Sequence, residues 1–341
     1  MPLKIGTLLY KEGSNMKNKI IAPKLNIPWE EKPSNCPSPI WRYSKNPIIK
    51  RNPIPGVARI FNSAVVPYKG EFIGVFRGDT FTTIPFLYLG RSKDAINFEF
   101  DEKPIEIYDE KGNLMKFDYC YDPRLIEVEG TYYVSFCTHM YGPTVAIIKT
   151  NDFKKFTFVS IPLLPFNRNG VLFPRRIDGD YVLLSRPSDN GHTPFGDIFL
   201  SKSKDMIDWG RHAHIMESGY EWWCGLKVGA GCNPIETNLG WLCFIHGTTK
   251  TCNGYVYSIG AIILDKDDPT KVLYRCSPYL LTPEMDYETN GFVPNVCFPT
   301  SALIDGDTGH IAIYAGAADT YVELLFTDID TILDYIVYNS R

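Results

Sequence analysis

The sequence predicts an all-β protein built as a β-propeller, and three observations support this fold class. Short runs of β-branched and aromatic residues, bounded by Gly, Asp or Pro, recur along the chain, for example at residues 72–76, 131–136 and 181–184. Apolar positions in the body of the chain alternate or cluster in fours and fives, without the i, i+3, i+4 spacing of an amphipathic helix. A weak internal repeat also recurs at roughly 50 to 60 residues, near the unit length of the longer propeller repeats.

The repeat consists of a strand, a polar turn and an aromatic residue. It occurs at residues 90–94 leading to Phe98, 150–153 leading to Phe156, and 201–205 leading to Trp209, with a degenerate fourth copy at 266–268. This spacing is too long for a solenoid, so we interpret each copy as one four-stranded blade with its polar turn on the rim. The alternative is that such turns recur by chance in a β protein.

The two ends of the chain differ from its body. Residues 1–50 are rich in Lys, Asn and Pro and lack periodicity, so we expect an N-terminal arm, and residues 51–341 are expected to form a single propeller domain. Trp29, Ile40 and Trp41 suggest that the arm either wraps its own propeller or clasps a neighbouring subunit. The C-terminal segment, residues 328–338, is expected to form a short helix or a closing strand.

Composition excludes several classes of protein. Of 341 residues, 44% are hydrophobic and 22% charged, which is typical of a folded chain rather than a disordered one. The net charge of -4 and the lack of a basic face argue against a nucleic-acid partner. No apolar stretch approaches the length of a membrane span, and the N-terminus leads into polar sequence, so we expect a cytoplasmic protein with no membrane partner.

The cysteines indicate neither a disulfide framework nor a zinc site. Nine cysteines are scattered without any CxxC pair, and we expect most to be small buried residues with no metal bound. They are Cys36, Cys120, Cys137, Cys224, Cys232, Cys243, Cys252, Cys276 and Cys297.

Asp122 is the residue most suited to acid–base chemistry. It lies in residues 119–124, between a polar turn and the strand-like run 125–128, with Tyr121 before it and Pro123 after it. Aromatic neighbours desolvate a carboxylate and the proline holds it still. The alternative, which the local sequence alone favours, is a turn aspartate, because Asp-Pro is a common turn opener.

Other polar residues stand singly in apolar or glycine-rich strings. A propeller collects loops from every blade around one axial pocket, so its site residues should be scattered along the chain in this way. Lys227, with Gly225, Gly229 and Gly231 around it, suggests a cation facing a cavity, although a surface lysine is the alternative. We interpret His139, His212 and His214 as surface or core residues, and Glu284, Asp286 and Glu288 as a solvated acidic rim.

Together the strings resemble glycoside hydrolase family 130, the β-mannoside phosphorylases and related hydrolases. The matching strings are residues 61–64, 76–78, 121–124, 171–174, 184–187, 225–231, 246–247 and 314–319, so the resemblance extends over nearly the whole chain from Ala58 to Asp319. It implies a five-bladed propeller. It also implies an inverting phosphorylase that reversibly cleaves a β-mannoside with inorganic phosphate and releases α-mannose 1-phosphate.

The resemblance also implies a role for each site residue. Asp122 would be the general acid, thought in this family to act through a hydroxyl of the sugar. The expected substrate-binding residues are Asn62, Arg77, Tyr121, His192, Tyr255 and Asp319, with Tyr121 and His192 on the leaving sugar. The expected phosphate-binding residues are Arg168, Arg186, Lys227, His246 and Tyr257.

Elementary chemistry agrees with a single acid. An inverting glycosidase needs a second carboxylate to activate water, whereas phosphate is already a nucleophile and needs cations to hold it. No metal or organic cofactor is then required, and inorganic phosphate is a co-substrate. Three alternatives stay open: the cations pair with some of the 39 acidic residues, the chain is a hydrolase using water and several carboxylates, or it binds carbohydrate without turnover.

The most detailed predictions concern the linkage of the substrate and the assembly of the protein. Tyr220, Trp222 and Trp223 form an expected stacking wall near residues 189–197, and their bulk suggests a short, closed acceptor site. On this basis the sequence favours β-1,2-mannobiose, with β-1,4-mannooligosaccharides and mannosyl-N-acetylglucosamine as alternatives. Because members of the resembled family are often oligomeric, we expect a homo-oligomer.

Overall fold

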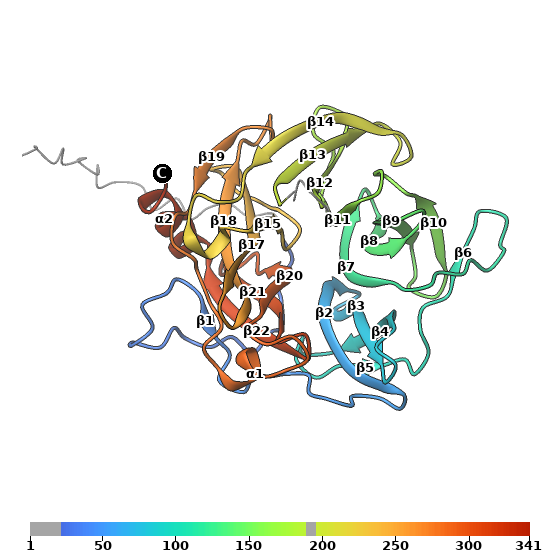
Figure 1. Ribbon diagram of the computed structural model, residues 1–341, viewed down its shortest axis with the longest axis horizontal. Helices are drawn as coiled ribbons and strands as arrows, with labels where there is room; N and C mark the ends of the chain where they lie inside the picture. The colour runs from blue at the N-terminus through green and yellow to red at the C-terminus, as the bar shows by residue number, and fades with distance from the viewer. Residues whose placement is uncertain (1–21, 189–195) are drawn as a thin grey trace, which may run out of the picture.

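The computed structural model describes residues 22–188 and 196–341. Figure 1 shows five sheets arranged like blades around a central axis. The prediction of a five-bladed β-propeller is therefore confirmed. Each sheet is packed between two others, so both of its faces are covered, and the central strands are nearly continuous apolar runs. The buried stretch 241–248 in the fourth blade is an example.

The first two blades hold the strands up to residue 160. Blade 1 is formed by β2 (Val57–Tyr68), β3 (Glu71–Thr80), β4 (Pro85–Ser92) and β5 (Glu99–Phe100). Blade 2 is formed by β7 (Tyr121–Val128), β8 (Thr131–His139), β9 (Pro143–Thr150) and β10 (Phe156–Ser160), with β6 (Ile107–Tyr108) parallel to β10 at its edge.

The next two blades follow the same antiparallel order. Blade 3 is formed by β11 (Asn167–Leu172), β12 (Tyr181–Pro187), β13 (Ile198–Ser203) and β14 (Trp209–Met216). Blade 4 is formed by β15 (Lys227–Ala230), β17 (Trp241–Thr251), β18 (Gly254–Leu264) and β19 (Val272–Arg275). The short β16 (Ile235–Glu236) pairs with β17, and a 3-10 helix (Trp222–Cys224) precedes β15.

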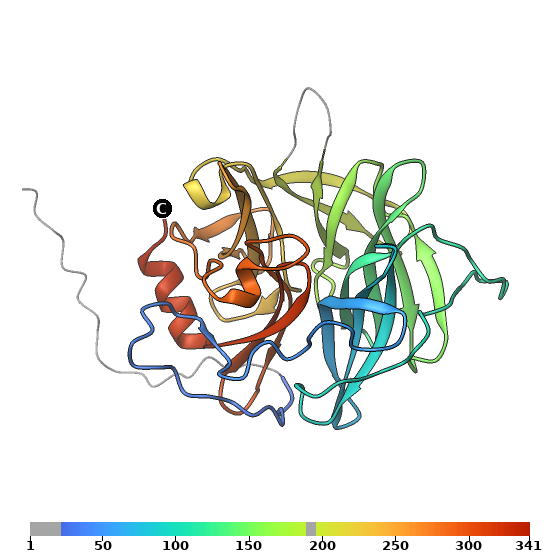
Figure 2. The same ribbon diagram turned by 60° about the horizontal axis from the view of Figure 1, so that its bottom comes forward.

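Blade 5 joins the two ends of the chain. Its strands are β20 (Cys297–Ile304), β21 (His310–Ala317), β22 (Tyr321–Asp328) and, from the N-terminal side, β1 (Trp41–Arg42). β1 pairs with β22 in antiparallel register, Trp41 opposite Phe326. Figure 2 shows the blue N-terminal segment running past the red blade 5 before it enters blade 1. The described part of the predicted arm thus wraps its own propeller and closes the ring.

Ring closure explains why the sequence repeat has only four copies. In blades 1 to 3 a hydroxyl ends the third strand and meets an aspartate two residues later: Ser92 and Asp94 at 2.9 Å, Thr150 and Asp152 at 3.4 Å, Ser203 and Asp205 at 3.0 Å. In blade 4, Asp265 accepts the corresponding backbone bonds after β18. Blade 5 takes its outer strand from β1, so no such turn follows β22.

The C-terminal segment is a helix. α2 (Ile329–Tyr338) follows β22 directly and buries Ile329, Ile332, Leu333 and Ile336, which are spaced i, i+3, i+4, i+7. These side chains pack into the hydrophobic cluster that blades 4 and 5 share. Of the two forms expected for this segment, the helix is the one observed, because its apolar stripe covers the side of blade 5.

Glu288 does not lie on a solvated rim, so that interpretation is wrong for this residue. It lies in the short helix α1 (Asp286–Thr289) and is fully buried. Arg42 of β1 donates to both of its oxygens, with Nε 2.5 Å from Oε1 and a terminal nitrogen 2.9 Å from Oε2. Glu284 remains exposed beside it. The sequence pattern missed Glu288 because its partner Arg42 lies in a strand 246 residues away in the chain.

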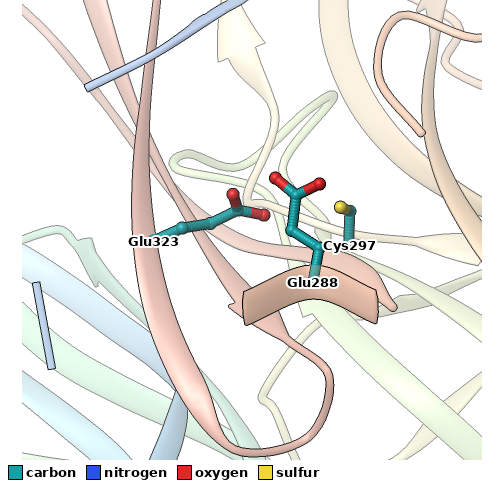
Figure 3. A group of neighbouring side chains, drawn as sticks. All are labelled: Glu288, Cys297 and Glu323. Atoms are coloured by element: carbon teal, nitrogen blue, oxygen red, sulfur yellow. The ribbon is translucent and has the colours of Figure 1, made fainter. Parts of the chain in front are cut away.

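Glu288 belongs to a buried cluster with Cys297 and Glu323 (Figure 3). The ligand-type atoms of the three lie within 4.8 Å of one another, but Arg42 already occupies both oxygens of Glu288. Burial and the neighbouring Glu288 raise the pKa of Glu323 well above its usual value, which favours the neutral form of Glu323. The cluster is therefore an ion pair with a protonated carboxyl that ties together β1, α1 and β22.

Most of the cysteines are buried, as expected. All nine are free, and all but Cys36 and Cys252 are wholly or almost wholly buried. Within the described residues there is no helix of the length and apolarity that crossing a bilayer requires.

Candidate active site

The inner ends of the blades surround a cavity of about 250 Å³. Its lining includes these predicted residues: Asn62, Arg77, Tyr121, Asp122, Arg168, Arg186, Lys227, His246, Tyr257 and Asp319. Tyr255 lies outside the lining, half-exposed, with its ring centre 5.9 Å from the Lys227 ammonium. His192 lies outside the described residues.

β-Bulges in the inner strands direct polar side chains toward this cavity. The ladder shifts register at Asn62 in β2, at Asp122 in β7 and at Asn169 in β11. These residues have φ of 48°, 51° and 54°, in the left-handed region that Asn and Asp tolerate better than other residues with a side chain. A bulge re-aims its side chain, so three blades present an Asn or Asp at equivalent places.

One half of the cavity, here called the acid half, is formed by Asn62, Arg77, Asp122 and Asp319. Asp122 is largely buried, and its Oδ1 accepts hydrogen bonds from Asn62 Nδ2 at 2.7 Å and from Arg77 at 3.1 Å. Arg77 is held in turn by Asp79, with Nε 2.9 Å from Oδ1. Two donors thus fix one oxygen of Asp122, and the residue itself lines the cavity.

Asp319 lies beside this network in the tight turn between β21 and β22. Burial raises the pKa of its carboxyl to about 6, and the nearby Asp122 adds to the rise while Arg77 opposes it. Gly316 explains how close the segments lie: a Cβ there would come 1.9 Å from Asn62 Oδ1. A glycine is therefore required for Asn62 to occupy its place.

The opposite half, here called the cation half, is formed by Arg168, Arg186, Lys227, His246 and Tyr257. Arg186 lies 2.9 Å from His246 Nε2. Burial first, and then Arg186 and Lys227, hold the pKa of His246 well below its usual value, so the ring is neutral. Arginine only donates, so Nε2 accepts and the ring proton lies on Nδ1.

Gly229 makes room for that ring. A Cβ at this position would lie 2.4 Å from His246 Cε1. The space that the missing side chain of Gly229 leaves is therefore occupied by the His246 side chain.

Lys227 completes the cation half. Its ammonium donates to the Tyr257 hydroxyl at 2.8 Å, and Arg168 donates to the Tyr121 hydroxyl at 2.8 Å. Burial, Arg186 and Arg168 lower the pKa of Lys227 to about 8. Within residues 22–188 and 196–341, Arg168, Arg186 and Lys227 form no ion pair with a carboxylate. Three cations around one cavity, none of them paired with a carboxylate of the described residues, form a site for an anion.

The expected stacking wall is wrong for Trp223. Its side chain is 1% exposed, and its indole Nε1 donates to the Ser277 carbonyl at 2.9 Å. The ring fills the space above Gly247 and Gly260, where a Cβ would come within 2.3 Å of it. Tyr220 and Trp222 are exposed, as stacking requires.

The sequence did not single out all of the lining. Cys137, Asn169, Val293, Val296 and Phe298 also line the cavity. Asn169 carried a signal, because it stands in the polar string 167–169 and occupies a bulge like those of Asn62 and Asp122. The apolar residues carried none, since only packing shows that Phe298 lies against His246, with ring centres 4.5 Å apart.

Comparisons with known proteins agree on one family. The family model of glycoside hydrolase family 130, described as beta-1,4-mannooligosaccharide phosphorylase, matches residues 23–338. A beta-1,4-mannooligosaccharide phosphorylase of Ruminococcus albus is 51% identical over 323 residues, 92% of this chain and 96% of the relative. A beta-1,2-mannobiose phosphorylase of Listeria innocua is 35% identical over 240 residues, 70% of this chain and 65% of the relative.

Solved structures extend the agreement to the fold. The structure of beta-1,2-mannobiose phosphorylase from Listeria innocua, in complex with beta-1,2-mannobiose, superposes with a TM-score of 0.78 and 26% identity. The match covers 88% of this chain and 99% of that one.

Proposed function

Since the chain belongs to glycoside hydrolase family 130, we propose that it is an inverting phosphorylase that cleaves β-1,4-linked mannooligosaccharides with inorganic phosphate. The observation that carries this proposal is the cation half. Arg168, Arg186 and Lys227 face the cavity without carboxylate partners in the described chain, opposite a single fixed acid, Asp122. A hydrolase would need a second carboxylate there rather than three cations.

In the proposed reaction, phosphate binds to the cation half and the mannose ring to Asn62, Arg77 and Asp319. A phosphate oxygen forms a bond to the anomeric carbon as the bond to the glycosidic oxygen breaks. The leaving oxygen keeps the electron pair and receives the proton that Asp122 supplies. The proton of the phosphate then restores Asp122, so the products are α-mannose 1-phosphate and a shortened sugar.

The β-1,4 linkage is proposed from two findings. The relative with 51% identity is a beta-1,4-mannooligosaccharide phosphorylase, and the matching family model carries the same description. The preference for β-1,2-mannobiose depended on an aromatic wall that includes Trp223, which is buried. That preference is not confirmed, and β-1,2-mannobiose becomes a comparison substrate.

The test is a substrate panel. The purified protein is incubated with β-1,4-mannobiose, β-1,4-mannotriose, β-1,2-mannobiose and mannosyl-N-acetylglucosamine, each with and without phosphate, and α-mannose 1-phosphate is measured. We expect phosphate-dependent product from the β-1,4-linked sugars, unchanged by a chelator because no metal is proposed. Sugar release that ignores phosphate would leave a hydrolase, and product from β-1,2-mannobiose alone would reverse the linkage.

Assembly is a separate proposal. We propose a homo-oligomer on the basis of the family, and sedimentation velocity tests it. A single monomeric species at assay concentrations would contradict it.

A further inference from the structure

Arg124 has no role in the reaction described above, although it follows Asp122 by two residues. Its side chain is 1% exposed and does not line the cavity. In the described parts of the chain it forms no ion pair, and burial lowers the pKa of its guanidinium. A buried cation without a counter-charge costs free energy, so its hydrogen bonds must serve a purpose that an apolar side chain could not.

Those hydrogen bonds hold the bulge that carries Asp122. One terminal nitrogen of Arg124 lies 3.2 Å from the Asp122 carbonyl and 3.0 Å from the Pro123 carbonyl. The register shift between Tyr121 and Arg124 takes these two carbonyls out of the ladder, and β7 resumes pairing at Arg124 opposite Ser135. The guanidinium therefore satisfies the acceptors that the bulge leaves free.

The same side chain reaches the strand of the cation half. Its Nε donates to the carbonyl of Gly231, which directly follows β15, the strand that begins with Lys227. Its guanidinium also lies 5.4 Å from the centre of the Phe298 ring, and Phe298 packs against His246. One rigid planar group thus joins the acid-bearing bulge of blade 2 to the inner edge of blades 4 and 5.

We propose that Arg124 is a positioning residue that fixes Asp122 relative to the phosphate subsite through hydrogen bonds to the carbonyls of Asp122, Pro123 and Gly231. The inference rests on the proposed phosphorylase function. A planar fork suits this task because it donates in several fixed directions, whereas a lysine ammonium is a single point donor. A displacement of the acid by about 1 Å is enough to cost roughly 100-fold in rate.

The test separates acid positioning from general damage. Arg124→Lys keeps the charge without the fork, and Arg124→Gln removes the charge. With β-1,4-mannobiose we expect kcat to fall about 10- to 100-fold in both, with the KM for phosphate changed less than about threefold. With 2,4-dinitrophenyl β-mannoside, whose leaving group needs no proton, both variants should keep nearly the wild-type kcat.

Two control variants test whether the effect is specific to the positioning of the acid. Asp122→Asn should show the same split between the two substrates, and Arg175→Met should show none, because Arg175 pairs with Glu236 away from the cavity. Equal losses on both substrates would overturn the proposal. A rise in the KM for phosphate in Arg124→Gln but not in Arg124→Lys would also overturn it, because the charge of Arg124 would then be the relevant property.

A structural measurement guards against a variant that folds poorly. We expect the crystal structure of Arg124→Lys to show Asp122 displaced from its left-handed conformation, and an unmoved Asp122 would overturn the inference. If the wild-type protein forms no α-mannose 1-phosphate, the proposed function fails instead. This outcome is measured on the wild-type protein and not on an Arg124 variant, so the two failures can be told apart.

Discussion

The two halves of the cavity differ in how their positive charges are balanced. In the acid half, Arg77 lies between Asp79 and Asp122 and forms an ion pair with each. In the cation half, the three cations within the described chain meet only hydroxyls and the neutral ring of His246. The charge of Arg77 in the acid half is balanced by neighbouring carboxylates. The cations of the cation half repel one another, and a bound anion would reduce that repulsion.

The pKa of Lys227 reflects the same difference between the halves. The pKa of Lys227 is lowered to about 8 by burial and by the two arginines, which shows that positive charge is in excess there. Cations that are gathered to bind an anion destabilise the protein when no anion is bound, because buried like charges repel. The difference between the halves therefore predicts that substitutions in the acid half affect the chemical step, while those in the cation half affect phosphate affinity.

The largest effect is expected from Asp122→Asn. Loss of a general acid costs about 10²- to 10⁴-fold in kcat with a natural mannooligosaccharide. Phosphate should still raise the melting temperature of the variant, since the cation half is intact. An unchanged kcat would remove Asp122 from the mechanism, and loss of the phosphate-dependent shift would contradict the separation of the halves.

Lys227→Met should act mainly on phosphate. A hydrogen bond to a charged group contributes roughly 1.5–3 kcal/mol, so the KM for phosphate should rise about 10- to 100-fold. The variant should also melt at a higher temperature at pH 7, because a repelled ammonium is removed. Lys266→Met is the matched control, since Lys266 pairs with Glu236, and an equal response in both variants would contradict the assignment.

Phosphate affinity should depend on pH through the same lysine. Lys227 is protonated below its pKa of about 8 and loses its charge as the pH rises through that value. The KM for phosphate should therefore increase between pH 7 and pH 9.5, by about tenfold for the loss of one charge-assisted bond. Lys227→Arg should shift the increase to higher pH, and a flat profile in the wild type would contradict this role.

The smallest effect on activity is expected from Glu323→Gln, which lies outside the cavity. The folded state raises the pKa of Glu323, so this group stabilises the protein fully below its unfolded pKa, and that stability is lost as the pH rises above it. The Gln variant should lose less melting temperature between pH 5 and pH 8 than the wild type. Its kcat should stay within about twofold.

Glu284→Gln is the control for that experiment, because Glu284 is exposed next to the same cluster. It should follow the wild-type pH profile. A large loss of activity in Glu323→Gln would contradict the confinement of function to the cavity.

Part of the site was predictable from the strings that resemble the family, although the local sequence around Asp122 alone favours a turn aspartate. Asn62 and Asp122 stand in apolar or aromatic strings, and their side chains tolerate the left-handed bulges that aim them at the cavity. The roles of Glu288 and Trp223 were not predictable, since the contacts that bury them come from Arg42 and Ser277, which are distant in sequence.

The strand-rich propeller and its polar turns follow from the amino-acid sequence, because alternation, turn residues and repeat length are local properties. It also carried the individual residues of both halves of the cavity. Only the folded structure shows how β1 closes the fifth blade, which cations have no carboxylate partner among the described residues, and how Arg124 spans from Asp122 to Gly231. These features depend on distances between segments far apart in the chain, and such distances exist only once the ring has closed.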